Sequence, residues 1–545
     1  MNLVQSADWN DPSVTTRDTT GADPLRPVRQ VYLAAIGVAA AIQFAVFAGA
    51  EHNLLSTLLC ALSSWIGIAY AVRGRRFRAH PISALILMFF TTTATSGALL
   101  VKTLEWAPLA ERLQVPVTTF AVLLATQVTL LLTDRLYLRT NALQRLRRGL
   151  TNRVLLPIGL LRWPRDGELW LMGGLGCISV LLTGTDYESG ATFGLASAGE
   201  KLIRAFGFLK FAPFLVPFRD ALSGVPSPRR AALMPLVLYF IALVVISFAT
   251  NSRSTFADAI PTIGICLLIA SATGRFSLRH VPASKLVLMA LGIALASLVL
   301  SRVALAMVVV RDYRYSVDVG MLVQMTLEAL TNTEWLEAAK AKMDTSVNVG
   351  NYSETYVDSR FFARFLLTKF HDNVLYYFSL FGDDQLNVYR QFMFDRLAAT
   401  LPDPLLQKLG LSINKEDLVI SNGDYIVYLI DGWGLGGFKT GSMIGEVFAV
   451  YGVAFPFVIA ASALLLFVFH DAFVAGPAPD GRLAVSPMIV LLIWNLVGTT
   501  AAFGLGAETV TAIPAGIVRG LPQNVLFYVI AAGSVRAAMR LVGQR

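Results

Sequence analysis

Runs of about 20 apolar residues recur along most of this chain and constrain its fold more than any other feature. A helix of that length crosses the roughly 30 Å hydrocarbon core of a bilayer, and hydrophobic residues make up 55% of the 545 positions against 15% charged ones. Backbone polar groups in lipid must be satisfied within the spanning element. We therefore predict an all-α, polytopic membrane protein with about 12 transmembrane helices, at roughly 31–50, 54–72, 82–101, 115–133, 169–183, 202–221, 231–249, 255–272, 286–309, 452–469, 487–504 and 520–537.

These spans divide the chain into four parts. Residues 1–30 are polar and form a tail, and residues 31–310 carry transmembrane helices 1–9. Residues 311–441 form one large loop rich in charged and aromatic side chains, which we expect to be helical. Residues 442–545 hold a helix that returns to the membrane and transmembrane helices 10–12.

The basic residues between the spans give an orientation. One side receives short clusters, whereas the opposite short loops hold only Lys102, Arg112, Arg253 and Arg519. Because Lys and Arg stay on the cytoplasmic side, both termini are predicted to be cytoplasmic and the loop 311–441 periplasmic, in a multi-pass protein of the bacterial inner membrane. The residues on the basic side are Arg73, Arg75, Arg76, Arg78, Arg135, Arg139, Arg145, Arg147, Arg148, Arg153, Arg229, Arg230, Arg275, Arg279, Lys285, Arg536 and Arg540.

The net charge of +9 does not indicate nucleic-acid binding, because the positive charge is spread over the loops between spans. The segment 311–440 holds 12 Lys and Arg against 17 Asp and Glu, a net charge of −5. The three cysteines all fall in predicted spans, so the large loop has no disulfide framework. The five histidines are isolated from one another, and no spacing suggests a metal or another cofactor.

Four cations lie in or next to spans near the side of the large loop. They are Arg204, Lys210, Arg253 and Arg302. Ionisable side chains at membrane depth usually face a polar cavity or a partner, and Arg grips phosphate oxygens in pairs. Together they favour a lipid pyrophosphate as ligand. The alternative is that each cation extends to the membrane surface or pairs with Glu200, Asp258 or a helix C-terminus.

A second candidate site lies in the large loop. If 359–378 is one helix, then Arg360, Arg364 and His371 lie within about 40° of each other around its axis. Two cations and an imidazole on one stripe could face a phosphate-bearing cleft, with His371 as general base. A solvated helix face is the equally weighted alternative.

The return to the membrane supplies a third candidate. The span that begins Thr440-Gly441-Ser442-Met443 carries the carboxylate Glu446 near the outer interface. That carboxylate could deprotonate a sugar hydroxyl or hold an arginine in place. Asp424, just before this segment, is the remaining candidate base.

Two stretches resemble motifs of a known superfamily. Asn251-Ser252-Arg253-Ser254 opens a span after the seventh helix, and the segment from Thr440 to Glu446 is followed by Tyr451-Gly452. With twelve spans and a large loop between the ninth and tenth, the chain resembles the Wzy-type O-antigen and exopolysaccharide polymerases, in the superfamily that includes O-antigen ligases.

This resemblance implies a GT-C-like glycosyltransferase bundle with an outward-facing site. It also implies arginines that bind pyrophosphate: Arg253 by its motif, and Arg360 and Arg364 by position and residue type. Ligases of the superfamily place a histidine eleven residues before the glycine of the returning helix. Counting back from Gly452 reaches Gly441, so that histidine is missing here and a polymerase is favoured.

The sequence therefore predicts a polymerase that joins polyprenyl-pyrophosphate-linked oligosaccharide repeat units into a surface polysaccharide or exopolysaccharide. Its expected partners are that lipid-linked substrate, membrane lipids, and a chain-length regulator and a flippase. No nucleic acid is expected. Arginines would supply the positive charge, so we expect no metal or other cofactor. The alternatives are a ligase that transfers polymer to a lipid acceptor, and a lipid-linked sugar flippase or polysaccharide exporter.

Overall fold

The structure, a computed structural model, is 77% helical, so the predicted all-α class is confirmed. It describes residues 23–184, 198–223, 233–250, 252, 254–273, 299, 301–303, 305–313, 317, 319–338, 352–363, 365–476, 483–497 and 504–543. The strands found there are β1 (Val474–Ala475) and β2 (Ala484–Val485), which pair antiparallel in a short hairpin.

Seven helical stretches in the described part of the chain are long and apolar enough to cross a membrane. They run over Arg26–Val46, Asn53–Ala71, Pro81–Leu104, Pro116–Arg139, Thr255–Ala272, Met443–Asp471 and Ala512–Leu541. Polytopic membrane character therefore follows from the structure, whereas the predicted number of 12 spans and a GT-C bundle do not.

Three further predicted spans are α-helices that are not among these seven stretches, and one predicted span is not an α-helix. The first three are α9 (Asp166–Gly184), α12 (Leu233–Ala249) and α25 (Pro487–Val497). The predicted span 202–221 is wrong: a 3-10 helix, η4 (Gly207–Phe218), lies between short α10 (Ala198–Arg204) and α11 (Arg219–Leu222). Pro213 and Pro217 lie inside η4 and remove the N–H groups that an α-helix needs. Most of the predicted span 286–309 lies outside the described residues.

The first helices form a bundle around α3 (Asn53–Ala71) and α7 (Pro116–Arg139), which pack against each other. Beside them lie α2 (Arg26–Val46) and a kinked stretch made of α5 (Pro81–Thr91), the π-helix η1 (Thr92–Ser96) and α6 (Gly97–Leu104). From the C-terminal part, α24 (Phe455–Asp471) packs on α7.

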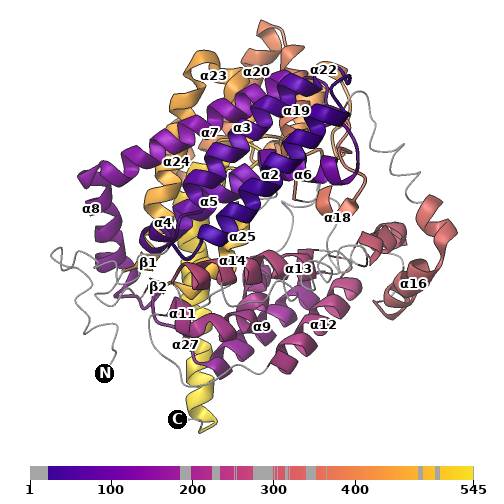
Figure 1. The fold of residues 1–545 in the computed structure, drawn as a ribbon. Coiled ribbons are helices and arrows are strands. Elements are labelled where there is room, and N and C mark those ends of the chain that lie inside the picture. The colour runs from indigo at the N-terminus through magenta and orange to yellow at the C-terminus, as the bar shows by residue number, and fades with distance from the viewer. Residues whose placement is uncertain are drawn as a thin grey trace.

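Buried polar contacts fasten one end of this bundle. Asp471, at the end of α24, accepts hydrogen bonds from the N–H groups of Ile82 (3.2 Å) and Ser83 (3.1 Å) at the start of α5. The carboxylate therefore satisfies N-terminal donors that α5 cannot satisfy itself. The arginine-rich α4 (Gly74–Ala79) lies at this end, away from α20 (Asp383–Ala398), α22 (Asn422–Asp431) and α23 (Met443–Tyr451) (Figure 1). So does α8 (Asn141–Leu150), since Thr151 after it donates to the main-chain oxygen of Ala472 at 2.7 Å.

A second group of helices packs against α4 and α25. It consists of α9, η4, α12, α14 (Ala259–Ala272) and α27 (Leu521–Leu541), of which α9, α12 and α14 lie together in the lower half of Figure 1. The remaining short elements are η2 (Thr151–Leu155), α13 (Ser254–Ala257), η6 (Val310–Tyr313), α16 (Val319–Thr331), α26 (Ala512–Ala515) and η9 (Gly516–Gly520).

The 311–441 segment contributes a compact set of helices, here called the loop layer: α19 (Thr368–Ser379), α20 (Asp383–Ala398) and α22 (Asn422–Asp431). Its core is aromatic, with Tyr352, Tyr377 and Tyr389 buried together. It covers the start of α23 (Met443–Tyr451), which packs on α19 (Figure 1). The shorter helices of the segment are α18 (Arg360–Ala363), α21 (Asp403–Lys408) and η7 (Glu416–Leu418), and η8 (Gly452–Ala454) follows α23.

The condition set for the second candidate site, one helix over 359–378, is not met, because α18 and α19 are separate. Between them, the N–H of Leu367 donates to the main-chain oxygen of Thr93 at 2.8 Å, and the Thr368 hydroxyl donates to that of Ala94 at 2.9 Å. Both acceptors belong to the π-helix η1 of the bundle. A tertiary contact thus interrupts the helix at the point where the sequence pattern continues.

Candidate functional site

The predicted phosphate-binding cations have separate surroundings where the structure describes them. Arg204 lies 3.6 Å from Glu200, the partner left open by the sequence, and the ammonium of Lys210 lies 5.0 Å from the ring centre of Phe211. Arg302 is exposed. Arg360 begins α18, and its side chain lies outside the described part, as do Arg253 and Arg364 entirely.

The three candidate bases, in contrast, gather around the segment that leads into α23. Asp424 on α22 accepts from the N–H groups of Phe438 (2.8 Å) and Lys439 (2.9 Å), and the Lys439 ammonium lies 3.7 Å away. These bonds hold the glycine-rich turn after α22, where Gly432 and Gly434 have φ of 72° and 102°. With its oxygens occupied by main-chain donors and a lysine, Asp424 anchors this turn.

His371 on α19 is 2% exposed and fixes the start of α23. Its Nδ1 lies 2.6 Å from Oγ of Ser442, and that Oγ accepts from the N–H of Gly445 at 3.0 Å as the helix N-cap. His371 and the Ser442 hydroxyl therefore share one short hydrogen bond at the start of α23. Burial lowers the pKa of His371 to about 3, so the ring stays neutral at pH 7.

Glu446 on α23 is fully buried and has three hydrogen-bonding groups around it. The Tyr389 hydroxyl of α20 lies 2.7 Å from Oε1, the Thr509 hydroxyl lies 2.8 Å from Oε1, and the N–H of Val510 lies 2.6 Å from Oε2. The same Tyr389 hydroxyl lies 2.7 Å from Oδ1 of Asn422. Glu446 thus joins α20, α22 and the segment before α26.

Glu446 differs from the other buried carboxylates in the described residues, because it has no ion-pair partner there. Five others each lie within 3.9 Å of a basic side chain. The pairs are Asp134 with Arg76, Glu168 with Arg536, Asp372 with Lys369, Asp424 with Lys439, and Asp471 with His80. A buried charge without a partner is expensive, so this position is chemically unusual.

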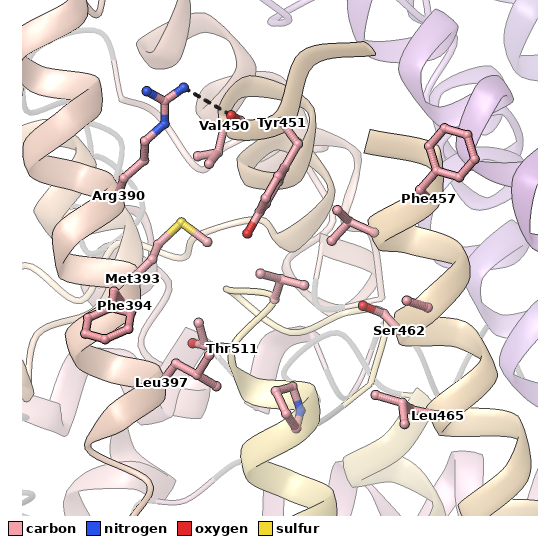
Figure 2. A pocket seen from close by; sticks show the side chains of 14 residues that line it. Arg390, Met393, Phe394, Leu397, Val450, Tyr451, Phe457, Ser462, Leu465 and Thr511 are labelled. Carbon is pink, nitrogen blue, oxygen red and sulfur yellow. Dashed lines mark hydrogen bonds between the residues drawn. The ribbon is translucent and has the colours of Figure 1, made fainter. Parts of the chain in front are cut away.

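A pocket of about 670 Å³ opens beside Glu446, between the loop layer and the helices that lead into the membrane. Its lining is mostly apolar, and its charged member, Arg390, donates to the main-chain oxygen of Val450 at 3.3 Å. Figure 2 shows these two residues at one end of the pocket and Leu397 and Leu465 toward the other. The lining residues are Arg390, Met393, Phe394, Leu397, Val450, Tyr451, Phe457, Val458, Ala461, Ser462, Leu465, Val510, Thr511 and Pro514.

Hydroxyl groups connect this pocket to Glu446. Thr511 lines the pocket, its Oγ1 lies 3.2 Å from Oγ1 of Thr509, and Thr509 donates to Glu446. Tyr389 lies one residue before Arg390 on α20, so the same helix contributes to the carboxylate and to the pocket.

Sequence reasoning missed Tyr389, Arg390, Thr509 and Thr511. The first two lie in a helix whose charged residues read as a solvated surface, and the threonines lie after a predicted span, in a segment without a motif. Of the predicted residues, the structure brings His371, Asp424 and Glu446 to one region. No protein-family model, no curated protein and no solved structure matches this chain.

Proposed function

We propose that this chain is a membrane glycosyltransferase that joins polyprenyl-pyrophosphate-linked oligosaccharide repeat units into a polysaccharide. The observation that carries the proposal is the pocket between the loop layer and α24. It is apolar along its length and has an arginine at one end, and a buried carboxyl is hydrogen-bonded to its wall.

The lining suits an amphiphile with a phosphate-bearing head. Phe457, Val458, Ala461 and Leu465 come from α24, which belongs to a candidate membrane span, and they offer an apolar wall to a hydrocarbon chain. Arg390 offers N–H groups in a planar fork that fits phosphate oxygens. The volume lies within the range of small-molecule sites.

In the proposed reaction, the head group lies at Arg390 and the sugar to be transferred lies between α20 and α23. The guanidinium stabilises negative charge on the departing pyrophosphate. The acceptor hydroxyl of the next repeat unit attacks the sugar carbon, and its proton leaves through groups in the pocket wall. This assignment moves the phosphate contact from the cations predicted by sequence to Arg390.

We further propose that the protein lies in the bacterial inner membrane with both termini in the cytoplasm and the loop layer in the periplasm. Support comes from the arginines of α4 and α8, which lie at the end of the bundle away from the loop layer (Figure 1). A flippase would deliver the substrate to this face, and a chain-length regulator would act on the growing product.

Reconstitution tests the proposed function. Purified protein in proteoliposomes is mixed with a polyprenyl-pyrophosphate repeat unit, and the glycan size is read on a gel. A ladder of increasing length is expected. Transfer of a finished polymer to a lipid acceptor, with no ladder, would instead identify a ligase. Movement of the unchanged lipid across the bilayer without any new glycosidic bond would identify a transporter.

Arg390→Ala is expected to raise the KM for the lipid-linked substrate roughly tenfold to a hundredfold, because a charge-assisted hydrogen bond contributes about 1.5–3 kcal/mol. Arg390→Lys keeps the charge without the fork and should lie between Ala and the wild type. Lys408→Ala, at an exposed position at the end of α21, is the matched control and should leave the KM unchanged. An unchanged KM in Arg390→Ala would remove this residue from the head-group site.

A further inference from the structure

We infer that Glu446 is a protonated carboxyl group that exchanges its proton with the pocket through the hydroxyls of Thr509 and Thr511. The inference concerns the resting state of the protein and the path to its pocket. Its use in glycosyl transfer rests on the proposed function.

Tyr389 has too few protons to donate to both of its partners. Its hydroxyl lies 2.7 Å from Glu446 Oε1 and 2.7 Å from Asn422 Oδ1, yet it has one proton to donate. Asn422 cannot be turned over to become the donor, because its Nδ2 donates to the main-chain oxygen of Glu508 at 2.8 Å. Both contacts are hydrogen bonds only if Tyr389 donates to Asn422 and Glu446 donates to Tyr389. Glu446 must then hold a proton.

The charges around Glu446 also favour a protonated carboxyl. On α20, Glu446 faces the hydroxyl of Tyr389; Arg396 of the same helix acts on Glu446 electrostatically from a longer distance but forms no ion pair with it. On the α19 side, the imidazole of His371 is neutral, and on the α22 side Asn422 separates it from the carboxylate of Glu508. The other elements around it contribute the Thr509 hydroxyl and the Val510 N–H. Among the described residues, none lies near Glu446 as the basic partner that each of the other five buried carboxylates has.

The hydrogen bonds around Glu446 lead toward the pocket on the side of Thr509. On the side of Asn422 the chain of hydrogen bonds ends at an amide, which does not pass protons on readily. On the side of Thr509 it continues over 2.8 Å and 3.2 Å contacts to Thr511, whose hydroxyl lies in the pocket wall (Figure 2). Each hydroxyl can accept one proton while it donates another. The threonine pair is therefore the route by which a proton leaves Glu446.

With these groups, the protons and electron pairs of the proposed reaction balance. The bond between the sugar carbon and the pyrophosphate oxygen breaks, and its electron pair stays on that oxygen, which takes a proton from Thr511. The Thr509 hydroxyl turns from Glu446 to Thr511 and replaces that proton, and it takes the Glu446 proton, which leaves its contact with Tyr389. The acceptor oxygen bonds to the sugar carbon, and its proton returns along the same path to the Glu446 carboxylate. One proton moves from acceptor to leaving group, and Glu446 ends as it began.

Infrared spectroscopy of the purified protein tests the protonation without any substrate. A protonated carboxyl has a carbonyl stretch that is separate from that of a carboxylate. At neutral pH the wild type should show such a band, and Glu446→Gln should lose it. Asp417→Asn, at an exposed position, is the control and should keep it. A wild-type spectrum without a band that depends on Glu446 would overturn the inference.

Transfer to heavy water tests the path. The band shifts when the carboxyl proton is exchanged for deuterium, and Thr511→Val should slow that exchange at least tenfold, whereas Thr511→Ser should not. Equal rates in the two variants would contradict the threonine route. If Glu446→Gln does not fold, Tyr389→Phe serves in its place, because loss of the hydroxyl should shift the band. Since none of these readouts needs glycan transfer, they stand or fall separately from the reconstitution assay.

Discussion

His371 and Glu446 lie on neighbouring helices, and their surroundings give them different tasks. The sequence marked both as candidate bases. His371 shares a hydrogen bond with Ser442 through one nitrogen and is held neutral, so it orients Ser442 and thereby the start of α23. Glu446 has three hydrogen-bonding partners, no ion pair in the described residues and a hydrogen-bonded path to a pocket. At the scale of single residues, hydrogen-bond partners separate a positioning group from a group that exchanges protons.

The neutral His371 predicts a pH dependence of stability. The histidine pKa is 6.5 in the unfolded reference and about 3 in the folded protein, so protonation below pH 6.5 favours the unfolded chain. Its stabilising contribution is complete above pH 6.5 and is lost toward pH 3, by about 1.4 kcal/mol per pH unit. His371→Asn keeps an acceptor for Ser442 but cannot be protonated in this range.

The measurement is thermal unfolding in detergent at pH 7 and pH 5. The wild type should lose about 2 kcal/mol more than His371→Asn over this interval. His52→Asn, at an exposed position, should behave like the wild type. An identical pH dependence in wild type and His371→Asn would show that His371 is not buried as a neutral ring.

At the scale of secondary structure elements, partners distant in sequence decide where helices begin and how closely they pack. Asp372 on α19 accepts from the N–H groups of Gln114 and Val115 at the start of α7, both at 2.8 Å, and so caps a helix of the bundle from the loop layer. In the second helix group, a Cβ at Gly176 of α9 would lie 2.1 Å from the backbone nitrogen of Lys210. Glycine at 176 therefore lets η4 lie directly against α9.

Two glycines of α9 allow a matched test of this packing. Gly176→Ala forces backbone against backbone and should destabilise the protein by about 2 kcal/mol or more, as overpacking does. Gly174→Ala has nothing within 4 Å of the added atom and should be neutral or slightly stabilising, because alanine favours the helix. Thermal unfolding of the two variants decides the point. Equal unfolding temperatures would mean that α9 and η4 are not in contact.

At the scale of the whole molecule, the charge distribution gives the proposed orientation. The arginines of α4 and α8 lie at one end of the bundle and the loop layer at the other (Figure 1), as expected if the membrane lies between them. In the proposed orientation the pocket would lie near the outer boundary of the bilayer, with α24 offered to the chain of the proposed lipid-linked sugar and α20 to its head.

Labelling of single cysteines tests this orientation. A membrane-impermeant maleimide should label Asp417→Cys in intact spheroplasts and Arg75→Cys only after the membrane is disrupted; both positions are exposed. Wild-type protein, whose Cys60 and Cys266 are buried and whose Cys177 is partly buried, gives the background. The reverse pattern would place the loop layer in the cytoplasm and would rule out a periplasmic site.

The sequence by itself determined that the chain is helical and suited to a membrane. The length and composition of an apolar run are local properties, and they decide whether a helix can cross the hydrocarbon core. The sequence also pointed to Glu446, since a carboxylate at the start of a span needs an explanation. Only the tertiary structure decided which elements are continuous. Contacts with η1 separate α18 from α19 within 359–378. The predicted span 202–221 contains η4, a 3-10 helix that includes Pro213 and Pro217.

The tertiary structure also decided the site. Tyr389, Arg390, Thr509 and Thr511 carry no motif, and they become a site because α20 and the segment before α26 meet at α23. A hydrogen bond depends on where two atoms lie in space, whereas a sequence pattern records only their separation along the chain. The residues around Glu446 lie 57 to 64 positions from it, beyond the reach of helical periodicity.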